Sequence, residues 1–137
     1  MNQLHLVLVD DNLEERNLMQ EARAEFAPEV LLTTIGTSTA LFDHLASHRF
    51  PHLLLVDLRL GRELGSEIAE RLQRHAAHAV PLVILSTAMD TAEKTRCLQA
   101  GACDFWVKPR MFEGYAVLFE QARLLVRKIL PACMESK

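Results

Sequence analysis

The sequence predicts an α/β fold in which five β-strands and five α-helices alternate along the chain. One observation is that five short apolar runs recur, and most are continuously apolar, which is typical of strands buried on both faces of a parallel sheet. The second is that the segments between the runs have apolar residues at helical spacing. Such a repeat is expected to form one parallel sheet with helices on both faces.

The strands are expected where the apolar runs lie. Pro51 and Pro81 stand just before the third and fourth runs, where a missing N–H does least harm to a sheet. The five predicted strands are residues 5–9, 30–34, 52–56, 82–85 and 105–107.

Helix signals occupy the segments between and after these strands. Asn12 with Glu15, and Asp90 with Glu93, have the spacing of a capping box, in which two residues bond each other's backbone N–H groups at a helix start. Apolar residues at intervals of three or four follow these starts. Pro131 is expected to end the last helix.

Length and composition fit one globular domain. The 137 residues are half apolar and 24% charged, with a net charge of −3, which excludes disordered, collagen-like and coiled-coil classes. No apolar run is long enough to cross a bilayer, and no block of like charge indicates a nucleic-acid arm. The three cysteines form no C-x-x-C pair, which is typical of free thiols in a reducing compartment. We expect a cytoplasmic protein that binds neither nucleic acid nor membrane directly.

Polar residues follow four of the five predicted strands. Asp10 and Asp11 come after the first strand, Asp57 after the third, Thr87 after the fourth and Lys108 after the fifth. In an open parallel sheet, ligands bind beyond the carboxyl ends of the strands, where the strand order reverses. With the flavodoxin-like, doubly wound (βα)5 order 2-1-3-4-5, these side chains converge on one pocket and the second strand is a remote edge.

The chemistry of this set points to a metal and a phosphoryl group. Three carboxylates packed together repel one another unless a cation joins them, and Mg²⁺ prefers oxygen ligands of this kind. A hydroxyl and an ammonium group beside them suit a phosphoryl group carried by an aspartate. The alternative for single residues is structural, because Asp11 or Asn12 could simply cap the following helix.

These residues resemble the receiver domain of two-component response regulators. The spacing fits, with 46 residues from Asp11 to Asp57, 30 more to Thr87 and 21 more to Lys108. The resemblance covers roughly residues 4–130, within a single domain spanning 1–137 that ends in a short tail at 131–137. The motifs that carry it are Asp10-Asp11, Asp57, Thr87-Ala88 and Lys108-Pro109.

The resemblance implies a role for each acidic residue. Asp57 would accept a phosphoryl group from a histidine kinase or a histidine phosphotransfer protein. Asp11 would bind Mg²⁺ (or Mn²⁺) directly and Asp10 mostly through water, while Asp57 and the backbone carbonyl of Arg59 would complete the protein ligands.

The resemblance also implies a switch. Thr87 and Lys108 would each bind a phosphoryl oxygen, and Thr87 would move toward it while Phe105 turns into the vacated space. The surface of the fourth helix, fifth strand and fifth helix would then change, and a phosphorylation-dependent homodimer could form through it. Arg59 and Met89 would tune the lifetime of the phosphate.

Two backbone features are expected near the site. Family members have a cis peptide before the proline that matches Pro109. Gly61 stands where proline is common in the family, so the loop after Asp57 should be looser.

Four functional readings follow. The leading one is a stand-alone, phosphorylation-dependent switch of a two-component or phosphorelay pathway, which catalyses only its own phosphorylation and dephosphorylation and contacts an unknown target protein. A receiver excised from a longer regulator is the second. The third is a phosphatase with an aspartyl nucleophile, which Arg59 disfavours because such enzymes have an acid there. A flavin carrier is the fourth, and the acidic, glycine-free loop after the first strand disfavours it.

Overall fold

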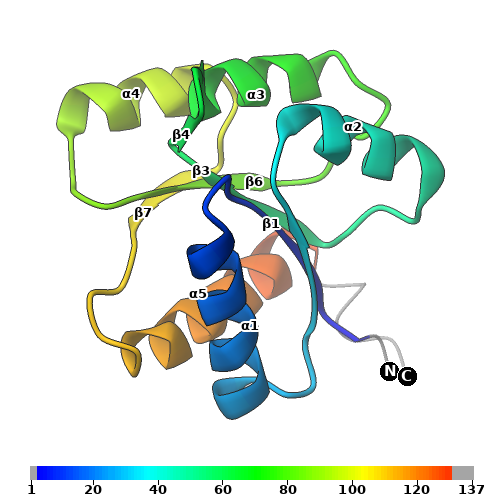
Figure 1. Cartoon of the computed structure of the whole chain (residues 1–137). Coiled ribbons are helices and arrows are strands. Elements are labelled where there is room, and N and C mark those ends of the chain that lie inside the picture. The colour runs from blue at the N-terminus through cyan, green and yellow to red at the C-terminus, as the bar shows by residue number, and fades with distance from the viewer. Residues whose placement is uncertain (1–2, 131–137) are drawn as a thin grey trace.

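Five parallel strands form the central layer of the molecule (Figure 1). The computed structural model describes residues 3–130, so the expected tail at 131–137, including Pro131, lies outside the described residues. The strands lie in the predicted order, 2-1-3-4-5 when counted along the chain, which confirms the flavodoxin-like topology. In sheet order they are β2 (Leu31–Ile35), β1 (His5–Val9), β3 (Leu53–Asp57), β6 (Leu82–Ser86) and β7 (Asp104–Val107).

The strand bounds differ from the prediction by at most one residue at either end, and the difference at β3 matters for the site. Its apolar run stops at Val56, but Asp57 still pairs with Leu85 of β6, and the N–H of Leu58 donates to the carbonyl of Leu85 at 2.9 Å. Backbone hydrogen bonds do not depend on side-chain polarity. Asp57 therefore belongs to the strand, and its backbone is held by the sheet.

Five helices cover the sheet on both faces (Figure 1). One face is covered by α1 (Leu13–Phe26) and α5 (Gly114–Ile129). The other face carries α2 (Ser38–Ser47), α3 (Gly65–Gln73) and α4 (Thr91–Gln99). No helix within residues 3–130 has the length and apolar character needed to span a membrane.

The predicted capping boxes are only half formed. Asn12 Oδ1 accepts the N–H of Glu15, and Asp90 Oδ1 accepts the N–H of Glu93, both at 3.1 Å. The N–H of Asn12, however, donates to Asp10 Oδ1 at 2.9 Å instead of to Glu15. The capping prediction is therefore wrong in its second half at α1, and the Glu15 carboxylate is available for another contact.

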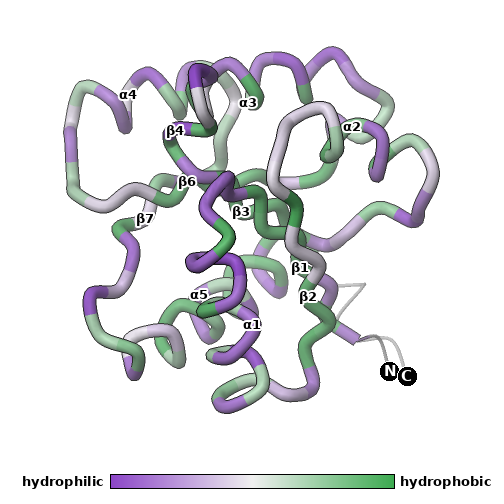
Figure 2. Tube along the Cα trace, viewed as in Figure 1, coloured by the Kyte–Doolittle hydropathy of each residue, from purple (hydrophilic) through white to green (hydrophobic). Residues whose placement is uncertain are grey.

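The core consists of two apolar clusters, one on each face of the sheet. Figure 2 shows the strands as a largely apolar layer, with polar residues concentrated on the helices and loops around it. Successive strand residues point to opposite faces, so Val7 and Val9 join the cluster under α2, α3 and α4, whereas Leu6 and Leu8 join the one under α1 and α5. This two-sided burial is why the strands read as continuous apolar runs.

A short hairpin follows β3 and was not predicted. It consists of β4 (Arg59–Leu60) and β5 (Glu63–Leu64), which pair in antiparallel fashion. Gly61 makes its turn with a φ of 60°, in the left-handed region that favours glycine. The N–H of Gly61 donates to Asp11 Oδ2 at 2.9 Å. The conformational freedom of Gly61 thus allows a tight turn here, and the looser loop stays a prediction.

The close packing of Gly65 against the end of β3 gives a stability prediction. A Cβ at Gly65 would lie 2.6 Å from Ile84 Cδ1 and 3.0 Å from the backbone oxygen of Asp57. Gly65→Ala should therefore lower the free energy of unfolding by about 1–3 kcal/mol, measured by urea denaturation, because the core is overpacked.

The matched control for this variant is Gly61→Asn. Nothing lies within 4 Å of a Cβ at Gly61, and Asn tolerates a positive φ, so this change should cost less than about 1 kcal/mol. Equal stability of Gly65→Ala and the unchanged protein would contradict the packing argument.

Candidate functional site

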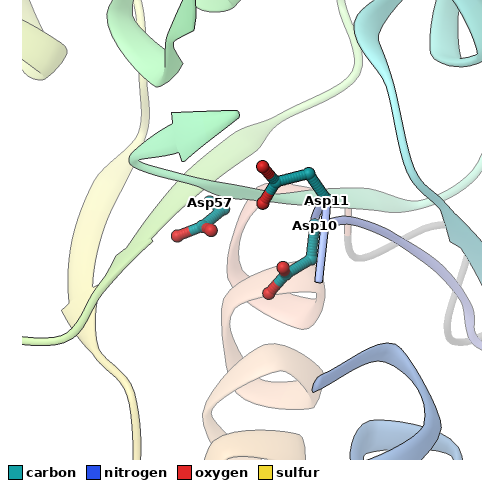
Figure 3. A group of neighbouring side chains, drawn as sticks. All are labelled: Asp10, Asp11 and Asp57. Carbon is teal, nitrogen blue, oxygen red and sulfur yellow. The ribbon is translucent and has the colours of Figure 1, made fainter. Parts of the chain in front are cut away.

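Three carboxylates meet at the carboxyl ends of two neighbouring strands (Figure 3). Asp10 and Asp11 follow β1, and Asp57 ends β3, which pairs directly with β1. One oxygen from each carboxylate lies within 4.8 Å of the others. Asp10 is buried, Asp57 is half-buried and Asp11 is exposed, so the group is open to solvent on one side.

Lys108 is the cation that faces these acids. It follows β7, and its Nζ lies 3.2 Å from Asp57 Oδ1 and 3.3 Å from Asp10 Oδ2. Its shortest contact is with Glu15 Oε1 on the first turn of α1, at 2.5 Å. The Lys108 side chain is 13% exposed, so these contacts are formed largely out of water.

Glu15 is a site residue that the sequence analysis missed. Its position three residues after Asn12 was interpreted as half of a capping box. The signal that could have found it is its place one helical turn after Asp11, because an acid there lies above the carboxyl end of β1. Whether it reaches Lys108, 93 residues further along the chain, depends on how α1 packs against the sheet.

The electrostatics of the pocket favour an added cation. Burial raises the pKa of Asp57; Lys108 opposes this effect, and the charges of Asp10 and Asp11 add to it. Burial likewise raises the pKa of Asp10. For Lys108, burial acts to lower the pKa, but the hydrogen bond to Glu15 and the charge of Asp57 raise it overall, so the side chain stays an ammonium.

The donor set fits a hard divalent cation. Three carboxylates with oxygens this close provide the ligands that Mg²⁺ or Mn²⁺ prefers, and the exposed side leaves room for water or phosphate oxygens. Arg59, the expected carbonyl ligand, lies in β4, two residues after Asp57. Its side chain extends to Glu93 of α4, with Nη2 and Oε2 3.8 Å apart.

Two other residues expected at the site, Thr87 and Met89, have exposed side chains. Thr87 directly follows β6, between β3, which ends at Asp57, and β7, which Lys108 follows. The Thr87 side chain is exposed, and its hydroxyl makes no hydrogen bond within residues 3–130. Met89 is 55% exposed. These two side chains therefore lie at the surface near the strand ends.

Phe105 and Pro109 flank Lys108 in the sequence, three residues before it and one residue after it. Phe105 is buried in β7 within the cluster under α2, α3 and α4. The expected cis peptide before Pro109 is absent, and every peptide bond within residues 3–130 is trans. A proline alone leaves the trans form favoured by about 0.5–1 kcal/mol, so surrounding contacts decide the isomer.

The crowding of the acids gives a prediction for the metal-free protein. Because the pKa of Asp57 is raised on folding, the native state binds a proton there more tightly than the unfolded chain does, so ionisation of Asp57 at neutral pH destabilises the fold. Asp57→Asn should raise the free energy of unfolding at pH 7 by on the order of 1 kcal/mol, since nearby like charges repel by a few kcal/mol and Lys108 offsets part of this.

The pH dependence of the stability gained by Asp57→Asn tests whether the gain comes from the ionised carboxylate. The gain should shrink as the pH falls through the raised pKa of Asp57 toward the unfolded value, because the unchanged protein then becomes protonated as well. Asp43→Asn, an exposed position on α2, should show no gain. A less stable Asp57→Asn protein in metal-free buffer would contradict the account.

Curated relatives with similar sequences include response regulators and other regulatory proteins. The chain is 31% identical over 107 residues to the cyclic di-GMP phosphodiesterase response regulator RpfG of Xanthomonas campestris, covering 77% of this chain and 28% of the relative. It is 36% identical over 106 residues to the regulatory protein VirG of Agrobacterium tumefaciens, covering 77% of this chain and 38% of the relative. The chain thus spans less than half the length of these two relatives.

Solved structures share the fold at lower identity. A CheY-like response regulator receiver domain protein from Methanospirillum hungatei matches with a TM-score of 0.77 at 16% identity, over 93% of this chain and 97% of that one. The Mn²⁺-bound form of the response regulator Rcp1 matches with a TM-score of 0.71 at 18% identity, over 88% of this chain and 91% of that one.

The model of the response regulator receiver domain matches residues 6–115, which is most of the chain. The matched segment includes the three carboxylates and Lys108. The chain therefore belongs to the response regulator receiver domain family.

Proposed function

We propose that this receiver domain is a phosphorylation-dependent switch that accepts a phosphoryl group on Asp57. The observation that carries the proposal is the half-buried Asp57 carboxylate, which lies between Asp10, Asp11 and the ammonium of Lys108. The phosphoryl donor would be a histidine kinase or a histidine phosphotransfer protein of a two-component system or phosphorelay. Family membership supports this reading over a phosphatase or a flavin carrier.

The chemistry follows from the charges in the pocket. An Asp57 oxygen attacks phosphorus, the bond from phosphorus to the donor's nitrogen breaks, and the electron pair leaves with that nitrogen. Lys108, 3.2 Å from Asp57, is placed to balance charge on a phosphoryl oxygen. Thr87, which follows β6 beside β3, would donate its hydroxyl to another oxygen.

Asp10, Asp11 and Asp57, together with the carbonyl of Arg59, would hold Mg²⁺ or Mn²⁺. The bound ion would supply positive charge against the phosphoryl oxygens and reduce the repulsion among the carboxylates. The acidic cluster supports this assignment, and so does the Mn²⁺-bound form of the related fold in Rcp1. Asp10 and Asp11 are already oriented by backbone N–H groups, those of Asn12 and Gly61.

The output would be a changed protein surface. Movement of Thr87 toward the phosphoryl group would let the buried Phe105 rearrange, with Arg59 and Met89 at the rim tuning the lifetime of the phosphate. The surface concerned consists of α4, the edge strand β7 and α5, and each has an exposed apolar residue: Leu98, Val107 and Val117. A downstream protein or a second copy of the chain would bind there.

The cellular setting completes the proposal. Catalysis is limited to the domain's own phosphorylation and dephosphorylation, and a cytoplasmic location agrees with Cys97 and Cys103, which are both free thiols. We propose that the functional unit spans the chain from 1 to 137, with its core at about 4–130. RpfG and VirG extend well beyond the matched segment, and a receiver excised from such a protein would carry the same site.

The direct test of the proposal is phosphorylation by a small donor. With Mg²⁺ and acetyl phosphate, the protein should show a reversible shift on a phosphate-affinity gel, and Asp57→Asn should not shift. The exposed Asp43→Asn variant on α2 should shift like the unchanged protein. Absence of a shift in the unchanged protein, or a full shift in Asp57→Asn, would refute Asp57 as the acceptor.

Metal binding gives an independent prediction. Mg²⁺ at about 100 times its dissociation constant should stabilise the fold by about 2.7 kcal/mol, because the ion binds only the native state. Asp11→Asn should lose most of this effect, and it should still fold because Asp11 is exposed. Thermal unfolding with and without Mg²⁺ measures the difference, and equal stabilisation of Asp11→Asn and Asp43→Asn would rule out Asp11 as a ligand.

A further inference from the structure

The ammonium of Lys108 has three carboxylate partners, and the shortest contact lies outside the metal and phosphoryl site. Glu15 Oε1 is 2.5 Å from Nζ, compared with 3.2 Å for Asp57 Oδ1 and 3.3 Å for Asp10 Oδ2. An ammonium group has three N–H donors, so one donor is available for each acid. The distances show that the lysine lies closest to Glu15 on α1 while it still contacts Asp57 and Asp10.

Glu15 differs from Asp10 and Asp57 because it does not belong to the group of carboxylates that could hold a cation. Asp10 and Asp57 belong to the group of carboxylates close enough to share a cation, whereas Glu15 does not. If Asp10, Asp11 and Asp57 held a cation, Lys108 would be repelled by its charge and would lose part of its attraction to Asp10 and Asp57. Glu15 is then the partner that remains available to the lysine.

Lys108 and Glu15 meet at a small cavity beside the carboxylates. Lys108 and Glu15 line a small cavity together with Met19, Tyr115 and Leu118. The backbone of Glu15 is fixed at the start of α1, because its N–H donates to Asn12 Oδ1. The ammonium and the carboxylate therefore meet at this cavity, beside the carboxylate group of Asp10, Asp11 and Asp57.

We propose that Glu15 is a positioning residue that holds Lys108 at rest and competes with the phosphoryl group for its ammonium. The inference rests on the proposed function, since it concerns the same lysine. Glu15 would keep its hydrogen bond with Lys108 when the carboxylate group holds a cation, and would thus favour cation binding. It opposes retention of the phosphoryl group, because the lysine must leave Glu15 to approach the phosphoryl oxygens.

Two binding constants test this role, and they should change in opposite directions. Glu15→Gln should weaken Mg²⁺ binding about threefold and should tighten beryllofluoride binding at saturating Mg²⁺ about threefold, effects of the size expected for a partly exposed ion pair. Both constants can be measured by isothermal titration calorimetry, with circular dichroism to verify folding. A purely structural role for Glu15 would not separate the two constants in this way.

Two further variants separate contact from charge. Glu15→Asp keeps the charge but is one methylene shorter, so it should behave like Glu15→Gln if the contact with Lys108 matters. Glu14→Gln removes the same charge from the neighbouring exposed position and should leave both constants unchanged.

The lysine itself provides a readout that needs neither metal nor phosphate. The chain has four lysines, so the Nζ resonance of Lys108 can be assigned by comparison with Lys108→Arg. In the metal-free protein, Glu15→Gln and Glu15→Asp should shift this resonance, whereas Glu14→Gln should not.

The outcomes separate this inference from the function on which it rests. Opposite changes in the two constants, seen in both Glu15 variants and absent in Glu14→Gln, support the positioning role. Unchanged constants, or changes in the same direction, overturn that role while leaving Asp57 as the acceptor. An unchanged protein that binds neither Mg²⁺ nor beryllofluoride overturns the proposed function and the role of Glu15 together.

Discussion

The structure around the carboxyl edge of the sheet depends on the balance between one ammonium group and the acids packed against it. Asp10 is buried and Asp57 is half-buried, and burying carboxylates is unfavourable unless opposite charge lies nearby. Lys108 supplies that charge to both. One ammonium does not neutralise this many carboxylates, and the remaining negative charge is what makes the pocket suited to a divalent cation. The cation and the lysine together could then balance an incoming phosphoryl group.

The sheet holds the backbone of Asp57, the proposed nucleophile, and leaves groups at the rim of the pocket more exposed. Asp57 lies within the hydrogen-bonded ladder between β3 and β6, and Gly65 packs directly against its backbone oxygen. Thr87 and Met89, in contrast, follow the end of β6 with exposed side chains. This division agrees with the proposed switch, in which Asp57 would keep its position while exposed groups at the rim rearrange.

Much of the fold and the convergence of the acids could be predicted because both depend on local patterns. Buried parallel strands read as continuous apolar runs, and the strand order then brings Asp10, Asp11 and Asp57 together. The hairpin β4–β5 could not be predicted, since two-residue strands have no recognisable periodicity. Glu15 was assigned to a local cap because its partner, Lys108, is distant in sequence and only the packing of α1 brings them together.

The measurement that tests the central claim most directly is identification of the modified residue. After incubation with Mg²⁺ and acetyl phosphate, borohydride reduction converts an acyl phosphate to an alcohol, so a phosphorylated aspartate becomes homoserine. Peptide mass spectrometry then locates it. We expect homoserine at Asp57 and at neither Asp10 nor Asp11. Homoserine at another aspartate, or at none, would contradict the account of this pocket.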